Sequence, residues 1–108
     1  MRNARGPAGV FEIVQLQHYY THMDPNLHQK KGIEHLNKVL QYAPMVAANG
    51  KATVHLTYED WHVVADTLFR MNTPREILPP AIKGFRLGQQ HRSIELDTSA
   101  LLISIEMF

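Results

Sequence analysis

Residues 53–74 carry the most regular pattern of apolar and polar positions in the chain. After position 60 the apolar side chains recur every three or four residues, which is the spacing of one face of an α-helix. The face predicted to be buried holds Trp61, Val64, Ala65, Leu68, Phe69, Met71 and Asn72, and the face predicted to be in solvent holds His62, Val63, Asp66, Thr67 and Arg70. We expect Trp61 to anchor the core and the Asp66–Arg70 pair to be solvated.

The start of this helix is marked by several signals. Thr57 can accept a hydrogen bond from the amide of Asp60, and the Asp60 carboxylate can return the contact as in a capping box. Glu59 adds further negative charge at the positive end of the helix. Just upstream, residues 51–56 alternate between polar and apolar positions, which predicts a short strand with Val54 and Leu56 directed inward.

A second helix is predicted to begin at Asp24, an N-cap residue followed by Pro25 at the first helical position. Its apolar stripe consists of Ile33, Leu36, Leu40, Ala43 and Ala47. Pro44 lies inside this pattern, and because a proline within a helix costs about 3 kcal/mol, we expect a kink or a break there. Asn49 and Gly50 suit the left-handed conformation that ends a helix.

The last part of the chain shows the alternation of strands. Residues 101–107 alternate between apolar and polar side chains, which is typical of a half-buried strand. A shorter alternating run occupies residues 93–96, and the sequence D-T-S-A between the two runs is suited to a turn. We therefore expect an antiparallel hairpin at the end of the sequence.

Three further segments are less regular. Residues 10–20 are rich in β-branched and aromatic side chains, which favours a strand, but the spacing of their apolar residues also fits a helix. The sequence T-P-R-E at residues 73–76 predicts the start of a brief helix with Thr73 as its cap. Residues 79–90 are interrupted by two prolines and two glycines, which indicates an ordered loop or a single helical turn.

Together these elements predict an α+β fold, a small and mostly antiparallel sheet with two main helices packed on one face and a C-terminal β-hairpin. We expect a single α+β domain over residues 10–108, preceded by a flexible leader at residues 1–9. The strand at residues 101–107 is the most apolar and is a candidate for the central position. If it lay at an edge, its unpaired main-chain groups would favour a homodimer.

Composition excludes several classes of function. The 11 Lys and Arg residues against 10 Asp and Glu leave a formal charge of +1, so no overall field attracts nucleic acid or an anionic membrane. The chain has no cysteine, which excludes disulfides, thiolate metal sites and thiol catalysis. No apolar run approaches the roughly 20 residues that a membrane-spanning helix needs. We therefore expect a soluble, cytoplasmic protein that does not contact a membrane.

The seven histidines raise the question of a metal site. His18 and His22 have the H-x-x-x-H spacing that places two imidazoles on one helix face, and Asp24 is a candidate third ligand. In a strand the same two residues would be about 13 Å apart, too far for one ion. A metal-dependent hydrolase at His18 and His22 is one alternative, but we expect neither a metal nor a cofactor. His55 and His62 are interpreted as ordinary, partly exposed histidines.

A local basic cluster between residues 70 and 92 is the main candidate surface. The residues predicted to bind a partner are Arg75, Lys83, Phe85, Arg86, His91 and Arg92. Guanidinium groups beside an aromatic ring suit an acidic protein surface or phosphate groups. A helix-turn-helix is a poor fit, because Pro79 and Pro80 would end its recognition helix early.

No catalytic motif accompanies this cluster. The tetrad G-K-A-T at residues 50–53 lacks the spacing of a phosphate-binding loop, and no G-x-S-x-G or glycine-rich dinucleotide motif is present. We therefore expect no enzymatic activity. The expected function is a protein-binding module, a small adaptor or inhibitor of the kind carried by phages and other mobile elements, which occupies a surface of a larger protein partner. The alternative is a nucleic-acid-binding regulator that uses the basic cluster.

Overall fold

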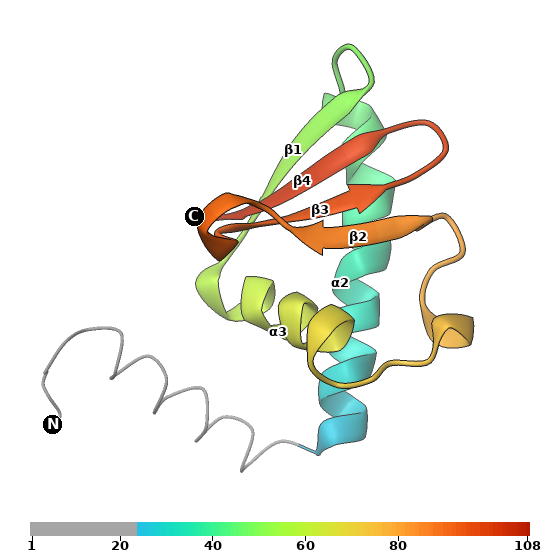
Figure 1. Ribbon diagram of the computed structural model, residues 1–108, viewed down its shortest axis with the longest axis vertical. Coiled ribbons are helices and arrows are strands. Elements are labelled where there is room, and N and C mark those ends of the chain that lie inside the picture. Colours follow the sequence, from blue (N-terminus) through green and yellow to red (C-terminus); the bar gives the residue numbers. More distant parts are fainter. Residues whose placement is uncertain (1–23) are drawn as a thin grey trace, which may run out of the picture.

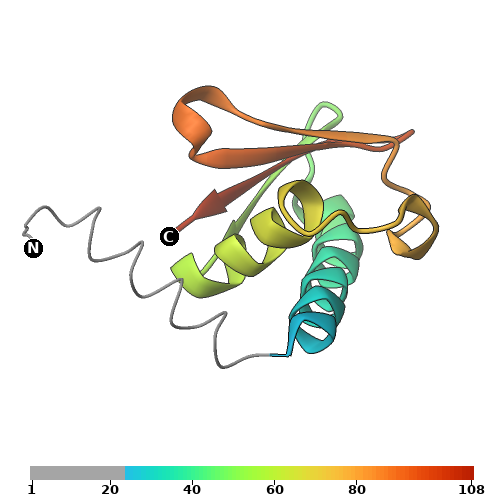
Figure 2. The ribbon, with the colours of Figure 1, turned by 60° about the horizontal axis from the view of Figure 1, so that its bottom comes forward.

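The computed structural model describes residues 24–108, which form two helices packed against one side of a four-stranded sheet (Figure 1). The elements follow in the order α2 (Pro25–Val46), β1 (Lys51–Leu56), α3 (Tyr58–Phe69), η1 (Arg75–Ile77), β2 (Gly84–Leu87), η2 (Gln89–His91), β3 (Ser93–Asp97) and β4 (Leu102–Met107). Figure 2 shows both helices beneath the same face of the sheet. The predicted α+β fold is confirmed. The predicted strand or helix at residues 10–20 lies outside the described residues.

The sheet has the strand order β1-β4-β3-β2. β4 pairs with β3 and β3 with β2 in antiparallel fashion, while β1 pairs with β4 in parallel. The predicted hairpin is β3 and β4, and its turn is closed by the Thr98 hydroxyl, which donates to the Leu101 carbonyl at 2.9 Å. β4 lies inside the sheet, with β1 on one side and β3 on the other, so the edge position considered from the sequence is excluded.

α2 begins as the sequence indicates. Asp24 is the N-cap and accepts a hydrogen bond from the amide of Asn26, and Pro25 opens the helix. The helix continues through Pro44 to Val46, so the predicted break is wrong. Pro44 lies within the last turn, where only a short piece of helix follows it, and the adjoining segment is tied directly to β1. The fully buried residues of α2 are His28, Gly32, Leu36, Val39 and Ala43.

The connection from α2 to β1 is a tight two-residue turn. Asn49 and Gly50 both have a positive φ, 56° and 77°, and the main chains of Ala48 and Lys51 exchange hydrogen bonds of 2.8 and 3.1 Å on either side. Two consecutive left-handed residues are the geometry of a hairpin turn that matches the twist of a strand pair. The predicted left-handed pair is therefore present, but it starts β1 instead of ending α2, which is capped by Ala47 in an extended conformation.

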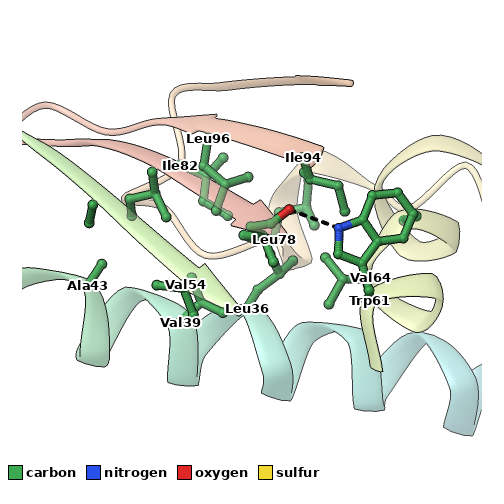
Figure 3. Close-up of a cluster of buried hydrophobic side chains, with 14 residues drawn as sticks. Leu36, Val39, Ala43, Val54, Trp61, Val64, Leu78, Ile82, Ile94 and Leu96 are labelled. Carbon is green, nitrogen blue, oxygen red and sulfur yellow. Dashed lines mark hydrogen bonds between the residues drawn. The ribbon is translucent and has the colours of Figure 1, made fainter. Parts of the chain in front are cut away.

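α3 is fixed at its start by the predicted cap. The Thr57 hydroxyl accepts from the Asp60 amide at 3.2 Å, and Glu59 and Asp60 lie in the first turn. Trp61 is buried, with 3% of its surface exposed, and its indole Nε1 donates to the carbonyl of Ile105 in β4 at 2.8 Å. Figure 3 shows this bond within the cluster of buried apolar side chains between sheet and helices. Trp61 therefore joins α3 to the middle of the central strand.

The predicted solvent face of α3 is wrong. Val63, Asp66 and Thr67 are buried, because α2 packs against the side of α3 that turns away from the sheet. The approach of the two helices is close at Gly32, where an added Cβ would lie 1.9 Å from the Thr67 Oγ1. A sequence pattern with one apolar stripe cannot show a second buried face that is lined by small and polar side chains.

Two local predictions for the segment after α3 are also corrected. Residues 84–87 form the edge strand β2, within the stretch predicted to be a loop or a helical turn, because pairing with β3 supplies the order that local sequence lacks. The short helix predicted at residues 73–76 is the 3-10 turn η1, but Thr73 does not cap it. The Thr73 hydroxyl instead donates to the Thr67 carbonyl at 2.6 Å and accepts from Gln29 at 2.9 Å, so it ties the end of α3 to the start of α2.

Candidate functional site

The six residues predicted to bind a partner do not form one surface. Phe85 and Arg86 are neighbours on β2 and therefore point to opposite faces of the sheet. Phe85 lies on the helix side, where its ring meets that of Phe69 edge to face at a centroid distance of 5.5 Å. Arg75 and Lys83 are exposed, and each donates to a main-chain carbonyl, Arg75 to Ile82 and Lys83 to Pro80.

The guanidinium of Arg86 is neutralised within the fold. Its Nε lies 2.7 Å from the Glu95 carboxylate on β3, and its Nη1 lies 3.5 Å from Asp97 on the same strand. Both acids are directly or diagonally across from Arg86 in the antiparallel register. The sequence-based charge count from residue 70 to residue 92 missed these partners, because they come from the next strand along the chain.

His91 and Arg92 are exposed at the turn between β2 and β3. Arg92 lines an open groove of about 780 Å³ on the face of the sheet that the helices leave uncovered, together with Ser93 and Glu95 of β3 and Glu106 of β4. The groove mixes one guanidinium with two carboxylates and hydroxyl groups, so it offers no uniform charge to a phosphate backbone. The basic cluster of the sequence is thus dispersed by the fold.

A buried polar cluster between α2 and α3 was missed by sequence reasoning. The His28 Nε2 lies 3.2 Å from the Asp66 Oδ2, each residue is 1% exposed, and the Asp66 Oδ1 accepts from the Arg70 Nη1 at 2.9 Å. The sequence does carry a signal for the burial of His28, because this residue lies four positions before Gly32 and eight before Leu36, on the buried stripe of α2. The pair is therefore enclosed in the contact between α2 and α3 and is not exposed at the surface.

Burial favours the neutral forms of both Asp66 and His28. It raises the pKa of Asp66 to about 6, against the opposing effect of the Arg70 guanidinium, which is near and donates a hydrogen bond. Burial, with a smaller effect of the Lys31 charge, lowers the pKa of His28 from 6.5. Neutral His28 can donate to ionised Asp66, while Arg70 reaches from the surface to supply the compensating charge.

This pair should make the stability of the protein depend on pH in two opposing ways. The raised pKa of Asp66 stabilises the fold while the carboxyl is protonated. Its contribution to the free energy of unfolding is complete below pH 3.8 and is lost as the pH rises through about 6. The lowered pKa of His28 gives a contribution to the free energy of unfolding that is complete above pH 6.5 and is lost as the pH falls. From pH 3.8 to 6 the free energy of unfolding of the wild type should fall relative to that of Asp66→Asn, measured by urea denaturation at each pH. Parallel profiles for the two proteins would contradict this assignment.

The outer edge of β1 is the second feature that the sequence did not reveal. In the parallel ladder the carbonyls of Gly50 and Leu56 accept from β4, so the main-chain groups of the even-numbered residues of β1 point toward β4. The odd-numbered residues point outward, and Lys51 is already paired with Ala48. Thr53 and His55 therefore present their N–H and C=O groups at an edge that no strand of residues 24–108 covers.

A groove of about 400 Å³ runs beside this edge, between β1 and α2. It is lined by Lys38, Val39, Tyr42, Thr53, Val54, His55, Leu56 and Phe108. Tyr42 and Phe108 are exposed, and the Phe108 ring stacks on His55 at a centroid distance of 5.8 Å. Met45 and Val46, in the last turn of α2, are exposed as well. An unpaired strand edge with an apolar trough beside it is the arrangement that binds extended segments.

Lys38 is the charged residue that lines this groove, and no Asp or Glu lines it. Lys51 lies at the start of β1, and neither lysine has a carboxylate within 4.0 Å in the described part of the chain. Glu106 is on the open face of the sheet, where its Oε1 lies 3.7 Å from the His55 Nε2. The groove is therefore largely apolar, with Lys38 as its charged group.

The described residues offer no obvious place for a metal. Among residues 24–108, no three or more His, Asp or Glu side chains lie together in a way that could hold an ion. The H-x-x-x-H pair at His18 and His22 lies outside the described residues. His62 packs its ring against Tyr58 and Trp61, and His55 takes part in the β1 edge. No helix in the same part of the chain has the length and apolar character needed to cross a bilayer.

The groove, the exposed strand edge and the buried histidine–aspartate pair are thus the distinctive features of the described domain. Comparison with known protein families, curated proteins and solved structures found no match to this chain.

Proposed function

We propose that this protein is a non-enzymatic protein-binding module that takes an extended segment of a larger partner as an additional strand on the outer edge of β1. The observation that carries the proposal is the outward direction of the Thr53 and His55 main-chain groups beside an apolar groove. Strand addition gives affinity through main-chain hydrogen bonds and selectivity through pockets for alternate side chains. An adaptor or an inhibitor that occupies a partner's surface works by this kind of contact.

The edge is short, and its length sets the size of the bound segment. Lys51 is closed off by Ala48, and the chain turns into α3 at Thr57, so only Thr53 and His55 can exchange main-chain hydrogen bonds with a new strand. A segment of about five residues covers this length at about 3.3 Å per residue. Short segments of this kind bind reversibly, which suits an adaptor that must release its partner.

A second copy of the chain fits this edge less well. The homodimer considered from sequence was to pair through residues 101–107, but that strand is β4 and is enclosed between β1 and β3. Pairing two β1 edges would bring together two grooves that each carry Lys38 and no acid, so neither copy supplies a charge complement for the other. A partner of different sequence is therefore the occupant that we propose.

A nucleic acid also fits less well, because the basic cluster that would bind it is divided. Arg86 is paired with Glu95 and Asp97, and Phe85 faces the helices. Arg92 shares its groove with two carboxylates. Phosphate contacts need a continuous basic surface with cations that are free to displace counterions.

Blocking the edge of β1 should abolish binding. In Thr53→Pro the ring removes the outward N–H of residue 53, which makes no bond within residues 24–108, while the ladder to β4 keeps its donors. Seven-residue peptides are first selected from a random displayed library against the wild-type protein, and their affinities are measured by fluorescence anisotropy. We expect Thr53→Pro to weaken the selected peptides at least tenfold.

Two controls make this test specific. Thr53→Ala keeps the main-chain donor and should bind the peptides as the wild type does, and circular dichroism shows whether each variant is folded. In the wild type, bound peptide should slow hydrogen exchange of the Thr53 and His55 amides. Peptides that bind Thr53→Pro with wild-type affinity, or that protect amides of β2 instead, would show that the β1 edge is not the binding site.

A further inference from the structure

We infer that the segment bound at β1 has an acidic residue opposite Thr53 next to an apolar residue opposite Val54. This inference rests on the proposed function and names the chemistry of the partner. It follows from how an added strand would place its side chains against the two sides of β1, one lined by the groove and the other by Lys51. The next paragraphs take the two sides in turn.

The central residue of the segment would lie opposite Val54 and point to the helix side of the sheet. Side chains alternate along β1, with Ala52 and Val54 buried toward the helices and Thr53 and His55 exposed on the other face. Residues directly opposite each other in a pair of strands point to the same face. The side chain opposite Val54 therefore enters the groove between β1 and α2, where Val39, Tyr42 and Leu56 offer apolar surface. A branched apolar side chain such as valine or isoleucine suits this position.

The two flanking residues would lie opposite Thr53 and His55 and point to the open face. A side chain opposite Thr53 has Lys51 and His55 as its diagonal neighbours, which long side chains can reach. The Lys51 ammonium has no acid partner within 4.0 Å in the described residues, so a carboxylate opposite Thr53 would supply one. The position opposite His55 has Thr53 and Thr57 as its diagonal neighbours, and His55 already lies 3.7 Å from Glu106 on this face. A Glu-Val-Glu triplet places one carboxylate opposite Thr53 whichever way the added strand runs.

Defined peptides test this triplet. Four capped peptides share two threonines on each side of a central triplet, which is Glu-Val-Glu, Gln-Val-Gln, Lys-Val-Lys or Glu-Ser-Glu. For the wild-type protein in low salt we expect Glu-Val-Glu to bind about two- to fivefold more tightly than Gln-Val-Gln, because one opposite-charge pair across strands adds a few-fold. The lysine peptide should bind most weakly. Loss of the valine should also weaken binding, and added salt should reduce the charge preference but not the valine preference.

Charge reversal on the protein side completes the test. The variant Lys51→Glu should lose or invert the preference for the glutamate peptide. The matched control is Lys30→Glu, an exposed lysine in the first turns of α2 that does not line the groove, and it should keep the wild-type order of affinities.

The outcomes separate the two proposals. If all four peptides bind equally and Thr53→Pro still blocks them, the acidic pattern is wrong while strand addition stands. The same holds if library-selected peptides protect Thr53 and His55 but carry no acids. If no selected peptide depends on the β1 edge, the proposed function fails together with this inference. A preference for glutamate that survives Lys51→Glu would also overturn the inference, because Lys51 would then not be its source.

Discussion

Replacing Trp61 with alanine should lower the free energy of unfolding by about 3–5 kcal/mol, the usual cost of emptying a large buried aromatic site. The indole is 3% exposed and fills the space between α3 and the sheet. Its loss also removes the donor to the Ile105 carbonyl at 2.8 Å, in the strand that holds β1 and β3 together. Since a small domain has about 5–15 kcal/mol of stability in total, this one change consumes a large share of it.

Urea denaturation followed by circular dichroism measures this effect. Trp61→Phe serves as the matched control, because it keeps much of the ring and removes the N–H, so it should cost less than Trp61→Ala. Thr57→Ala provides a reference at the same end of α3: the hydroxyl accepts from the Asp60 amide near the surface, and its loss should cost only about 1 kcal/mol. A cost for Trp61→Ala no larger than that of Thr57→Ala would contradict the central position of the indole.

Adding a single methyl group at Gly32 should destabilise the protein by about 1–3 kcal/mol. Propensity alone predicts the opposite sign, since alanine favours a helix interior by about 1 kcal/mol over glycine. The new Cβ would lie 1.9 Å from the Oγ1 and 2.7 Å from the Cβ of Thr67, well inside contact distance. Thr67 is buried and β-branched, and its hydroxyl is bonded to the Val63 carbonyl, so it cannot turn aside and the helices must separate.

A double-mutant cycle identifies the clash as the cause. Thr67→Gly clears the atoms that the new methyl group would meet, so Gly32→Ala should cost less in that background than in the wild type. The measurement is again the free energy of unfolding from urea denaturation. Additive costs for the two changes would show that Gly32→Ala acts somewhere other than at the contact with Thr67.

Both predictions also bear on the binding edge. The groove is formed between β1 and α2, and the position of α2 is set by its contact with α3 at Gly32 and by the polar ties from Gln29 and His28. Trp61 in turn fixes α3 to the sheet. A variant that remains folded but moves α2 away from the sheet would widen the groove, so peptide affinity in Gly32→Ala reports on packing as well as stability.

The local signals in the sequence were largely sufficient for the individual elements. Asp24 and Thr57 cap the helices as their side chains predict, because a capping hydrogen bond needs only residues two or three positions away. The alternation in residues 101–107 identified β4 as a buried strand, since a period of two needs no partner to be read. The same reasoning failed for β2, whose order comes from pairing with β3 across a turn.

The candidate site was much less accessible from the sequence. The predicted set of Arg75, Lys83, Phe85, Arg86, His91 and Arg92 was chosen by nearness along the chain, and the fold spreads it over two faces of the sheet. The β1 edge depends on which strand is last in the sheet, and the groove depends on a helix that precedes β1 by one tight turn. Neither the strand order nor the position of the helix beside β1 can be predicted from local composition.

The sequence by itself determined where the two main helices and strands β1, β3 and β4 begin, which residue anchors the core, and the α+β class, because caps, turns and periodicity act over a few residues. Only the tertiary structure decided that β1 lies parallel beside β4 with a free outer edge, that Asp66 is enclosed with His28, and that Arg86 meets two acids. These features are contacts between residues far apart in the chain. Burial and charge pairing arise only when such residues meet. A side chain that the local pattern predicts to be in solvent can therefore be buried in the fold.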